Sequence, residues 1–547
     1  MDSTVFTNGR IFTPGDKPDE HVFQEAMVIV GDRIEHVVGR STDDAVRGAL
    51  SAGATHIDLA DKIVVPGFID SHMHIVDFAL SRRKLDLLHC KSLDDIRREI
   101  RAYAEKHPSE PRIVCKSWIQ STTGGVALAS MLDDLDPRPI YIHANDLHSG
   151  WCNTAALEEI GAPTMADPPG GKIHRDESGW PTGLLSETAH LAVVPPFLTK
   201  ATSKQDKLAA LTDAAAAYSA AGYTGMIDMA MDDMEWDVLK EFRKQCGDSF
   251  PFHIAAHWLI PYSEDLNEIM RHLDTAIARN REYSPTQCPE FCIVGIKLMS
   301  DGVVDGCTAA LKEPYDGSTD LIPTIWPADA LEAVVKKADA AGLQCAIHAI
   351  GDQAVKQAID GLSHAQPGHR HRIEHLELTA PEDAKRLGQL GITASVQPVH
   401  SDPALFRAWP DLIGKHRCSR AFAYKDFLDG GAPVAIGTDA PTANHLSLPN
   451  LYNATTRRSA IEPECDETVN SHFGISLGAA VTAASTGAAY SRFADTWTGR
   501  LRRGYRADFV VLDMEWDAES LLKAKVQQTW ARGRKSYEGE TSDTKLR

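Results

Sequence analysis

The chain has 547 residues and carries 56 Lys and Arg against 76 Asp and Glu, a formal net charge of −20. This length exceeds that of one ordinary domain, and the acidic balance argues against a phosphate-binding surface, including one for nucleic acid. Apolar residues make up 43% of the chain and charged residues 24%, which is typical of a globular protein with a large core and excludes a disordered or collagen-like chain.

Neither the N-terminal residues nor any later segment predicts secretion or membrane insertion. The start, MDSTVFTNGRIFTPG, has no basic head followed by an apolar run, and no stretch of about eighteen uninterrupted apolar residues occurs. The 10 cysteines include no CxxC pair, and the closest two are Cys288 and Cys292, which indicates reduced thiols. We expect a cytoplasmic protein that acts on a small molecule, has no nucleic-acid or membrane partner, and is compatible with homo-oligomerisation.

Segments at the two ends of the chain have the same β-strand character. Both are rich in β-branched residues and punctuated by turns, and the N-terminal segment contains a hairpin turn at Gly31 and Asp32. The segments are 3–12, 26–38, 507–513 and 526–539. We expect the two ends to join in one small β-sandwich domain made of residues 1–65 and 495–547.

Between these ends, apolar strand-like runs alternate with alanine-rich helical stretches such as 208–222 and 328–342. Eight apolar runs lead into a polar residue: 68–74, 223–229, 252–258, 292–298, 344–349, 371–376, 392–397 and 433–439. Alternating strands and helices form a parallel sheet, and eight such units close a barrel. We therefore predict an α/β fold, a (β/α)8 TIM barrel, over residues 66–494.

A large insertion is predicted after the first barrel strand. About 150 residues separate the first apolar run from the second, far more than one strand-to-helix connection needs. Loops after barrel strands gather at the catalytic face. The segment at about 78–205 is therefore expected to cover the active site and shape its pocket.

Side chains that can bind a metal ion end several of the predicted barrel strands. His72 and His74 are two residues apart on a strand, so their imidazoles project to the same side. The other donors at strand ends are Lys297, His348, His375 and Asp439. Each of these alone is more often a core histidine, a helix cap or half of an ion pair. Together, at the same end of one barrel, they indicate a metal site.

In these motifs the chain resembles the metal-dependent amidohydrolase superfamily, and within it the amidohydrolase-3 branch of YtcJ-like proteins and N-substituted formamide deformylases. The resemblance spans nearly the whole chain. The superfamily motifs are VVPGFIDSHMHI, IHAIGDQAV, HRIEHLE, GTDAP and RADFVVLD. The branch is identified by IKLMSDGVVDGCTAAL and YIHANDLHSGWCNTAAL.

The resemblance implies a binuclear site, most often zinc, although other divalent metals are compatible with it. His72, His74 and Asp439 would hold one ion, and His348 and His375 the other. Lys297 would bridge the two ions as a carbamate, because a lysine ammonium has no lone pair to offer a cation. An unmodified Lys297 in a mononuclear site is the alternative.

The resemblance also implies the reaction. The two metals activate a hydroxide, since bound water loses its proton near neutral pH, and Asp439 carries the proton to the leaving nitrogen. We expect hydrolysis of a carbon–nitrogen bond, in an amide, N-formyl or related group, of a small organic substrate. The alternatives are an esterase or lactonase, a mononuclear deaminase on the same fold, and a non-catalytic scaffold.

Substrate contacts are predicted from position alone. Asp146 and His148 lie where relatives have a similar DGH motif, Asp301 follows Lys297, and His400 follows the seventh predicted strand. Trp118 and Trp151 are predicted to line an aromatic pocket together with His400. For each of these side chains, and for His257 at the end of the third strand, ordinary packing is the alternative.

Two further motifs receive a structural interpretation. The HRH sequence at 369–371 precedes its strand, and we predict a solvated basic loop there. The sequence 474–478 fits the GxSxG pattern of a serine hydrolase, but no apolar strand precedes Ser476 and no His follows it. We therefore predict that Ser476 caps a helix.

Overall fold

The structure, a computed structural model, describes residues 3–15, 20–145, 149–168, 171–366 and 368–540. The chain divides into two compact units: Met1–Ile75 together with Ala215–Arg547, and Val76–Ala214. The inserted unit therefore extends beyond the predicted range of about 78–205 at both ends. Within the described ranges, no helix combines the length and the apolar character that a membrane crossing requires.

The first unit contains an eight-stranded parallel sheet in the order β21-β20-β19-β18-β17-β16-β15-β8. The strands are β8 (Phe68–Met73), β15 (Tyr223–Met231), β16 (His253–Leu259), β17 (Phe291–Met299), β18 (Gln344–Ala349), β19 (Arg372–His375), β20 (Thr393–Val396) and β21 (Val434–Ile436). A single parallel bridge between Met73 and Ala440 brings the first strand beside the last. The predicted eight-stranded α/β barrel is confirmed, and the ring is nearly closed.

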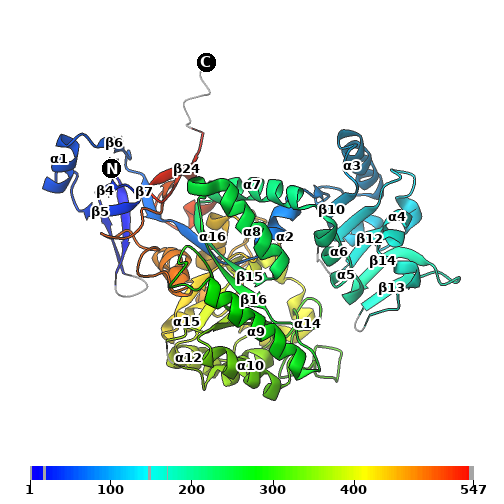
Figure 1. Cartoon of the computed structure of the whole chain (residues 1–547). Coiled ribbons are helices and arrows are strands. Elements are labelled where there is room, and N and C mark those ends of the chain that lie inside the picture. The colour runs from blue at the N-terminus through cyan, green and yellow to red at the C-terminus, as the bar shows by residue number, and fades with distance from the viewer. Residues whose placement is uncertain (1–2, 16–19, 146–148, 169–170, 367, 541–547) are drawn as a thin grey trace. The chain divides into compact units, whose positions relative to one another are not determined.

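Helices cover the outer face of the barrel strands (Figure 1). They are α8 (Asp233–Cys246), α9 (Leu266–Glu282), α10 (Ala328–Ala340), α11 (Asp352–Leu362) and α12 (Pro381–Leu390). In α9, for example, the Asp265 side chain caps the first turn, and Ile269, Leu273 and Ile277 form the buried stripe. Ser476 likewise caps α17 (Leu477–Thr482) by accepting from Ala479 N, so the helix-cap prediction is confirmed.

The buried carboxylate of Asp70 connects the first strand of the barrel to the segment after the last. It accepts hydrogen bonds from Thr438 N (2.9 Å) and Thr438 Oγ1 (2.6 Å), and from Tyr218 OH (3.1 Å). Gly437 allows the backbones of these two segments to lie close together, because a Cβ at this position would lie 2.4 Å from His72 N. These contacts hold the segments that carry His72 and Asp439 side by side.

Strands from both ends of the chain form two further sheets in this unit. One has the order β5-β4-β1-β6 and the other β24-β23-β22-β7-β2-β3. The strands are β1 (Ser3–Thr7), β2 (Arg10–Pro14), β3 (His21–Gln24), β4 (Ala26–Val30), β5 (Arg33–Val38), β6 (Thr55–Asp58), β7 (Ile63–Pro66), β22 (Phe509–Asp513), β23 (Lys525–Ala531) and β24 (Arg534–Glu538). A shared core that includes Phe6, Val64, Phe509 and Trp530 joins the two sheets. Strands from the two chain ends therefore share one sheet. The β-sandwich domain of residues 1–65 and 495–547 stays a prediction.

The inserted unit is built on a six-stranded sheet in the order β13-β14-β12-β11-β10-β9. The strands are β9 (Leu85–Asp86), β10 (Ile113–Trp118), β11 (Ile140–Ala144), β12 (Ser149–Cys152), β13 (Gly171–Arg175) and β14 (Pro181–Glu187). Hydrophobic residues lie on both faces of this sheet, including Ile140 and Ile142 in one core and Tyr141 and Leu185 in the other. The insertion thus has its own folding core. Its predicted role as a cover over the active site stays a prediction.

Truncating Phe509 tests how strongly the core shared by the chain ends contributes to stability. Its ring contacts Phe6 at a centroid distance of 5.2 Å and Trp530 at 5.5 Å. We expect Phe509→Ala to lower the free energy of unfolding by about 3–5 kcal/mol, because it removes buried area and leaves a cavity. Chemical denaturation measures the effect. Val22→Ala, at a strand position that is exposed, is the control and should change stability by less than about 0.5 kcal/mol.

Candidate metal centre

All six predicted donors lie at one end of the barrel. His72 is the last residue but one of β8, Lys297 and His348 lie near the ends of β17 and β18, His375 ends β19, and His74 and Asp439 follow their strands. The ring centroid of His375 lies 4.8 Å from that of His72 and 4.4 Å from that of His348. The structure therefore brings these side chains together, as the strand-end positions predict.

Donor atoms around Asp439 are arranged as if around a cation. His72 Nε2 lies 3.3 Å and His74 Nε2 3.1 Å from Asp439 Oδ1. Glu374 Oε2 accepts a hydrogen bond from His72 Nδ1 at 2.7 Å, which leaves the lone pair of Nε2 to face the Asp439 carboxylate. A lone pair facing a carboxylate oxygen in a buried site needs a proton or a metal ion between them. These residues suit a divalent metal.

The imidazoles of His348 and His375 are poised to act as neutral ligands. Burial lowers the pKa of His348 to about 3, and the charge of Lys297 adds to this effect. Burial, together with His348 and His72, holds the pKa of His375 well below its ordinary value. The carbonyl of Gly302 accepts from His348 Nε2 at 3.2 Å, which leaves the Nδ1 lone pair for a ligand. His375 Nδ1 is buried and has no hydrogen-bond partner among the described residues.

Lys297 is buried at the inner end of the same cluster. Burial lowers the pKa of its amine to about 8, against the opposing attraction of the Glu374 and Asp439 carboxylates. A larger fraction of this amine is therefore neutral near physiological pH than in an ordinary lysine. A neutral amine is nucleophilic, so the site favours a lysine that can react with carbon dioxide.

Asp439 is ionised despite its burial. Burial alone would raise the pKa of its carboxyl group, but the neighbouring His72 and His74 hold it well below the ordinary value. The residue has a left-handed backbone with φ of 60°. Asp439 N donates to His72 O at 2.6 Å, so the strained segment is fixed against the first barrel strand.

A strained backbone also directs His375 into the site. Residues of a strand alternate between its two faces, and Arg372 and Glu374 point into the barrel, where they contact Ser395 and His72 respectively. Regular alternation would turn His375 outward. Its φ of 75°, followed by 54° at Leu376, breaks the alternation. The imidazole consequently points toward the other candidate metal ligands.

Glu374 is a functional residue that the sequence analysis missed. Arg372 Nε donates to its Oε1 at 2.6 Å, and both side chains are fully buried. Burial alone would raise the pKa of this carboxyl group, but Arg372 and His72 hold it well below its ordinary value. A carboxylate on the far nitrogen of a ligand histidine fixes the tautomer and the ring orientation. Arg372 and Glu374 are two residues apart on one strand and so share its inward face. This spacing was the sequence signal that could have identified Glu374.

Glu377 and His400 form a second polar pair beside the cluster. Glu377 Oε1 lies 3.1 Å from His400 Nδ1, and His400 Nε2 lies 3.6 Å from Asp439 Oδ2. The ring of His400 stacks on that of His375 at 5.8 Å. Burial would lower the pKa of His400, but the hydrogen bond and charge of Glu377 raise it overall. His400 therefore lies beside the proposed reaction centre, and Glu377 was not anticipated.

The other predicted substrate residues lie in different settings. Asp301 accepts from the backbone N–H groups of Ala310, Ile350 and Gly351, which is a structural role, and burial raises its pKa to about 7. Trp118 and Trp151 are buried in the core of the inserted unit, with ring centroids 5.2 Å apart. Their contact with a substrate stays a prediction.

The remaining predicted residues are Asp146, His148 and His257. Asp146 and His148 lie outside the described residues. His257 is fully buried, and its Nε2 pairs with Gln344 Oε1 at 2.8 Å, which corresponds to the packing alternative.

Comparisons with known proteins agree with the geometry. A model described as "Amidohydrolase family" matches residues 55–537. The chain belongs to the amidohydrolase family. Among relatives, it is 28% identical to "Putative amidohydrolase YtcJ" of Bacillus subtilis (strain 168), over 98% of this chain and 99% of that protein. The resemblance identified from the motifs is therefore confirmed.

Other relatives of this amidohydrolase carry different names. It is 29% identical to "Protein LONG AFTER FAR-RED 3" of Arabidopsis thaliana, covering 97% of this chain and 91% of that one. It is 23% identical to the "N-substituted formamide deformylase" of Arthrobacter pascens, covering 94% and 95%. An "uncharacterized metal-dependent hydrolase" from Pyrococcus furiosus shares the fold, with a TM-score of 0.77, 24% identity, and coverage of 94% of this chain and 99% of that chain.

A second histidine cluster in this amidohydrolase lies among the outer helices. Asp339 of α10 accepts from His369 Nδ1 at 2.5 Å and from His371 Nε2 at 3.0 Å. The prediction of a solvated loop at 369–371 is wrong, because His371 is buried and faces this carboxylate. Cys345 N donates to His371 Nδ1 at 2.9 Å, so the proton of a neutral His371 is on Nε2. That nitrogen has no lone pair for a metal, and the cluster is a hydrogen-bonded clamp.

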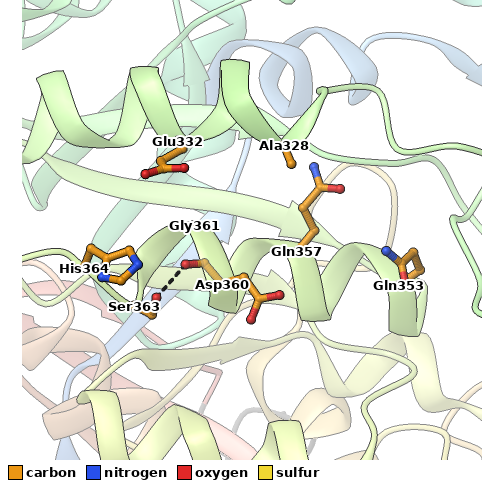
Figure 2. A pocket seen from close by; sticks show the side chains of 8 residues that line it. All are labelled: Ala328, Glu332, Gln353, Gln357, Asp360, Gly361, Ser363 and His364. Carbon is orange, nitrogen blue, oxygen red and sulfur yellow. Dashed lines mark hydrogen bonds between the residues drawn. The ribbon is translucent and has the colours of Figure 1, made fainter.

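A polar cavity of about 430 Å³ also lies in the outer layer, between α10 and α11 (Figure 2). Several polar side chains of its lining are bonded to the protein itself. Asp360 pairs with Arg386 at 2.7 Å, and the Gln357 amide donates to Trp326 O at 2.7 Å and accepts from Thr324 at 2.9 Å. The cavity therefore lacks the converging donors that the barrel mouth provides.

Replacing one histidine in each cluster distinguishes their roles. We expect His375→Ala to lose at least one bound metal ion per chain, because it removes a ligand. We expect His369→Ala to keep the wild-type metal content, because the clamp holds no metal. Inductively coupled plasma mass spectrometry after dialysis measures both. Loss of metal in His369→Ala, or full retention in His375→Ala, would contradict the assignment.

Proposed function

We propose that this amidohydrolase uses a divalent metal pair, zinc in the first instance, to hydrolyse a carbon–nitrogen bond of a small amide, N-formyl or related substrate. The observation that carries the proposal is the convergence of His72 Nε2 and His74 Nε2 on one oxygen of an ionised Asp439. Imidazole and carboxylate ligands suit zinc. The printed names "Putative amidohydrolase YtcJ" and "N-substituted formamide deformylase" support the same reaction class.

Each ligand has a distinct place in the proposal. His72, His74 and Asp439 would hold one ion, His348 and His375 the other, and the carbamate of Lys297 would lie between them. Ions at these positions would lower the pKa of bound water toward neutrality and polarise the substrate carbonyl. Carbamate formation balances as one neutral lysine amine plus carbon dioxide giving a carbamate anion and a proton.

Asp439 accepts and then donates the proton that the reaction transfers. Its low pKa keeps the carboxylate ionised before the reaction begins, so it can accept a proton from water as the oxygen attacks the carbonyl carbon. The same carboxyl group then gives the proton to the nitrogen as the carbon–nitrogen bond breaks. The products are a carboxylic acid and an amine. Glu377 orients His400, which faces Asp439 and is positioned to contact the substrate.

The Asp439→Asn variant tests the proton-transfer role. The amide can occupy the same space but cannot accept the proton, so we expect turnover of N-substituted formamides or aryl amides to fall by about 10²- to 10⁴-fold with the fold retained. Asp429→Asn, at an exposed carboxylate paired with Lys425, is the control. Steady-state kinetics and circular dichroism measure the two quantities. Near-normal activity in Asp439→Asn would refute the role.

Metal content separates this proposal from the alternatives. Two ions per chain in the active protein support the binuclear hydrolase. One ion per chain supports a mononuclear deaminase, and none supports a non-catalytic scaffold. Parallel assays with esters and lactones report whether the site prefers carbon–oxygen bonds.

The pKa of Lys297 predicts how carbamate formation depends on pH. An amine with a pKa of about 8 is protonated below that pH and neutral above it. At constant dissolved carbon dioxide, we therefore expect the rate of carbamate formation in metal-free protein supplied with zinc to rise with pH and level off above about 8. Carbon-13 NMR of labelled carbon dioxide reports the adduct directly. The signal should be absent in Lys297→Met and present in the surface variant Lys425→Met; a signal that persists in Lys297→Met would contradict the assignment.

A further inference from the structure

The inner face of β17 continues past Lys297 with an apolar side chain. Lys297 and Met299 are two residues apart, so both point to the same face of the strand. Met299 pairs in register with His348, whose ring belongs to the metal cluster. Lys297 is only 1% exposed, whereas Met299 is 36% exposed. Met299 therefore lies one step nearer the barrel mouth than the proposed bridging ligand.

Two more exposed apolar side chains lie beside this strand end. Ile325 N donates to Ser300 O at 2.8 Å, which places the Ile325 backbone beside the residue that follows Met299. Tyr262 follows β16, whose end is bonded to β17 through Ile260 N and Lys297 O at 3.0 Å. The Tyr262 ring packs edge-on against Trp326 at 5.2 Å. Ile325 is 43% exposed and Tyr262 is 37% exposed, although Trp326 beneath them is fully buried.

Another part of the mouth, where the chain leaves β19, β20 and β21, is acidic. Glu377 and Asp439 lie there with His400 between them. Asp305 is close enough for its negative charge to help raise the pKa of Glu377, which burial raises most. Carboxylates in this part of the mouth disfavour an anionic substituent on the substrate, whereas methionine, isoleucine and tyrosine offer apolar contact area.

We infer that Met299, Ile325 and Tyr262 form the subsite for an uncharged apolar group of the substrate, an inference that rests on the proposed function. The substrate class is then amides or formamides with an alkyl or aryl substituent. N-acyl amino acids, whose free carboxylate would meet Glu377 and Asp305 or the apolar side chains, are poor substrates.

Alkyl hydroxamates of increasing length test the subsite without requiring turnover, because their head group binds metal and is not hydrolysed. For zinc-loaded wild-type protein, we expect the dissociation constant, measured by calorimetry, to fall about two- to fourfold for each added methylene. In Met299→Gln the fall per methylene should shrink to less than about half the wild-type factor. A hydroxamate that ends in a carboxylate should bind more weakly than its apolar analogue of equal length.

Controls make the outcomes distinct. Ile325→Gln provides a second test at the subsite, and Leu390→Gln, at an exposed apolar position at the end of α12, should keep the wild-type dependence. Equal affinity for all chain lengths in the wild type, or an unchanged dependence in both subsite variants, would overturn the inference. If the length dependence holds but no amide or formamide with the same tails is hydrolysed, the subsite stands and the proposed reaction fails.

Discussion

A single carboxylate oxygen organises the candidate site. Asp439 Oδ1 has the Nε2 atoms of two histidines within 3.3 Å, and one of these histidines, His72, donates its Nδ1–H to Glu374. Such an arrangement of negative charge and lone pairs is stable in a buried site only when a cation joins it. The neutral histidines, the low pKa of Asp439 and the partly neutral Lys297 are all consequences of this buried, donor-rich environment.

Backbone constraints bring the donors to that oxygen. Asp70 joins the first barrel strand to the segment that carries Asp439, and Gly437 lets the two backbones approach. Left-handed backbone at His375 and Asp439 turns both side chains in directions that a regular strand does not offer. The barrel topology thus brings the donor residues to one rim, and the left-handed backbone of a few residues orients their side chains toward the candidate metal site.

The barrel and its donors were predictable because both follow from simple periodicity. A continuous apolar run predicts a strand that is buried on both faces, and the strand ends of one barrel meet at one rim. The direction of His375 was not predictable, because its positive φ leaves no mark in residue type. The solvated loop at 369–371 was wrong for a related reason: Asp339, which buries His371, comes from a helix about thirty residues earlier. The inserted unit ended later than expected because its last helix, α7 (Lys204–Ala220), continues across the boundary into the barrel unit.

The pairing of β7 with β22 has a consequence for synthesis on the ribosome. β7 ends at Pro66, two residues before the strand that carries His72, and its partner β22 begins at Phe509. The nascent chain therefore leaves one edge of β7 unpaired until residues 509–513 have been made. A chain that stops short of residue 509 keeps this open sheet edge, which is prone to aggregation.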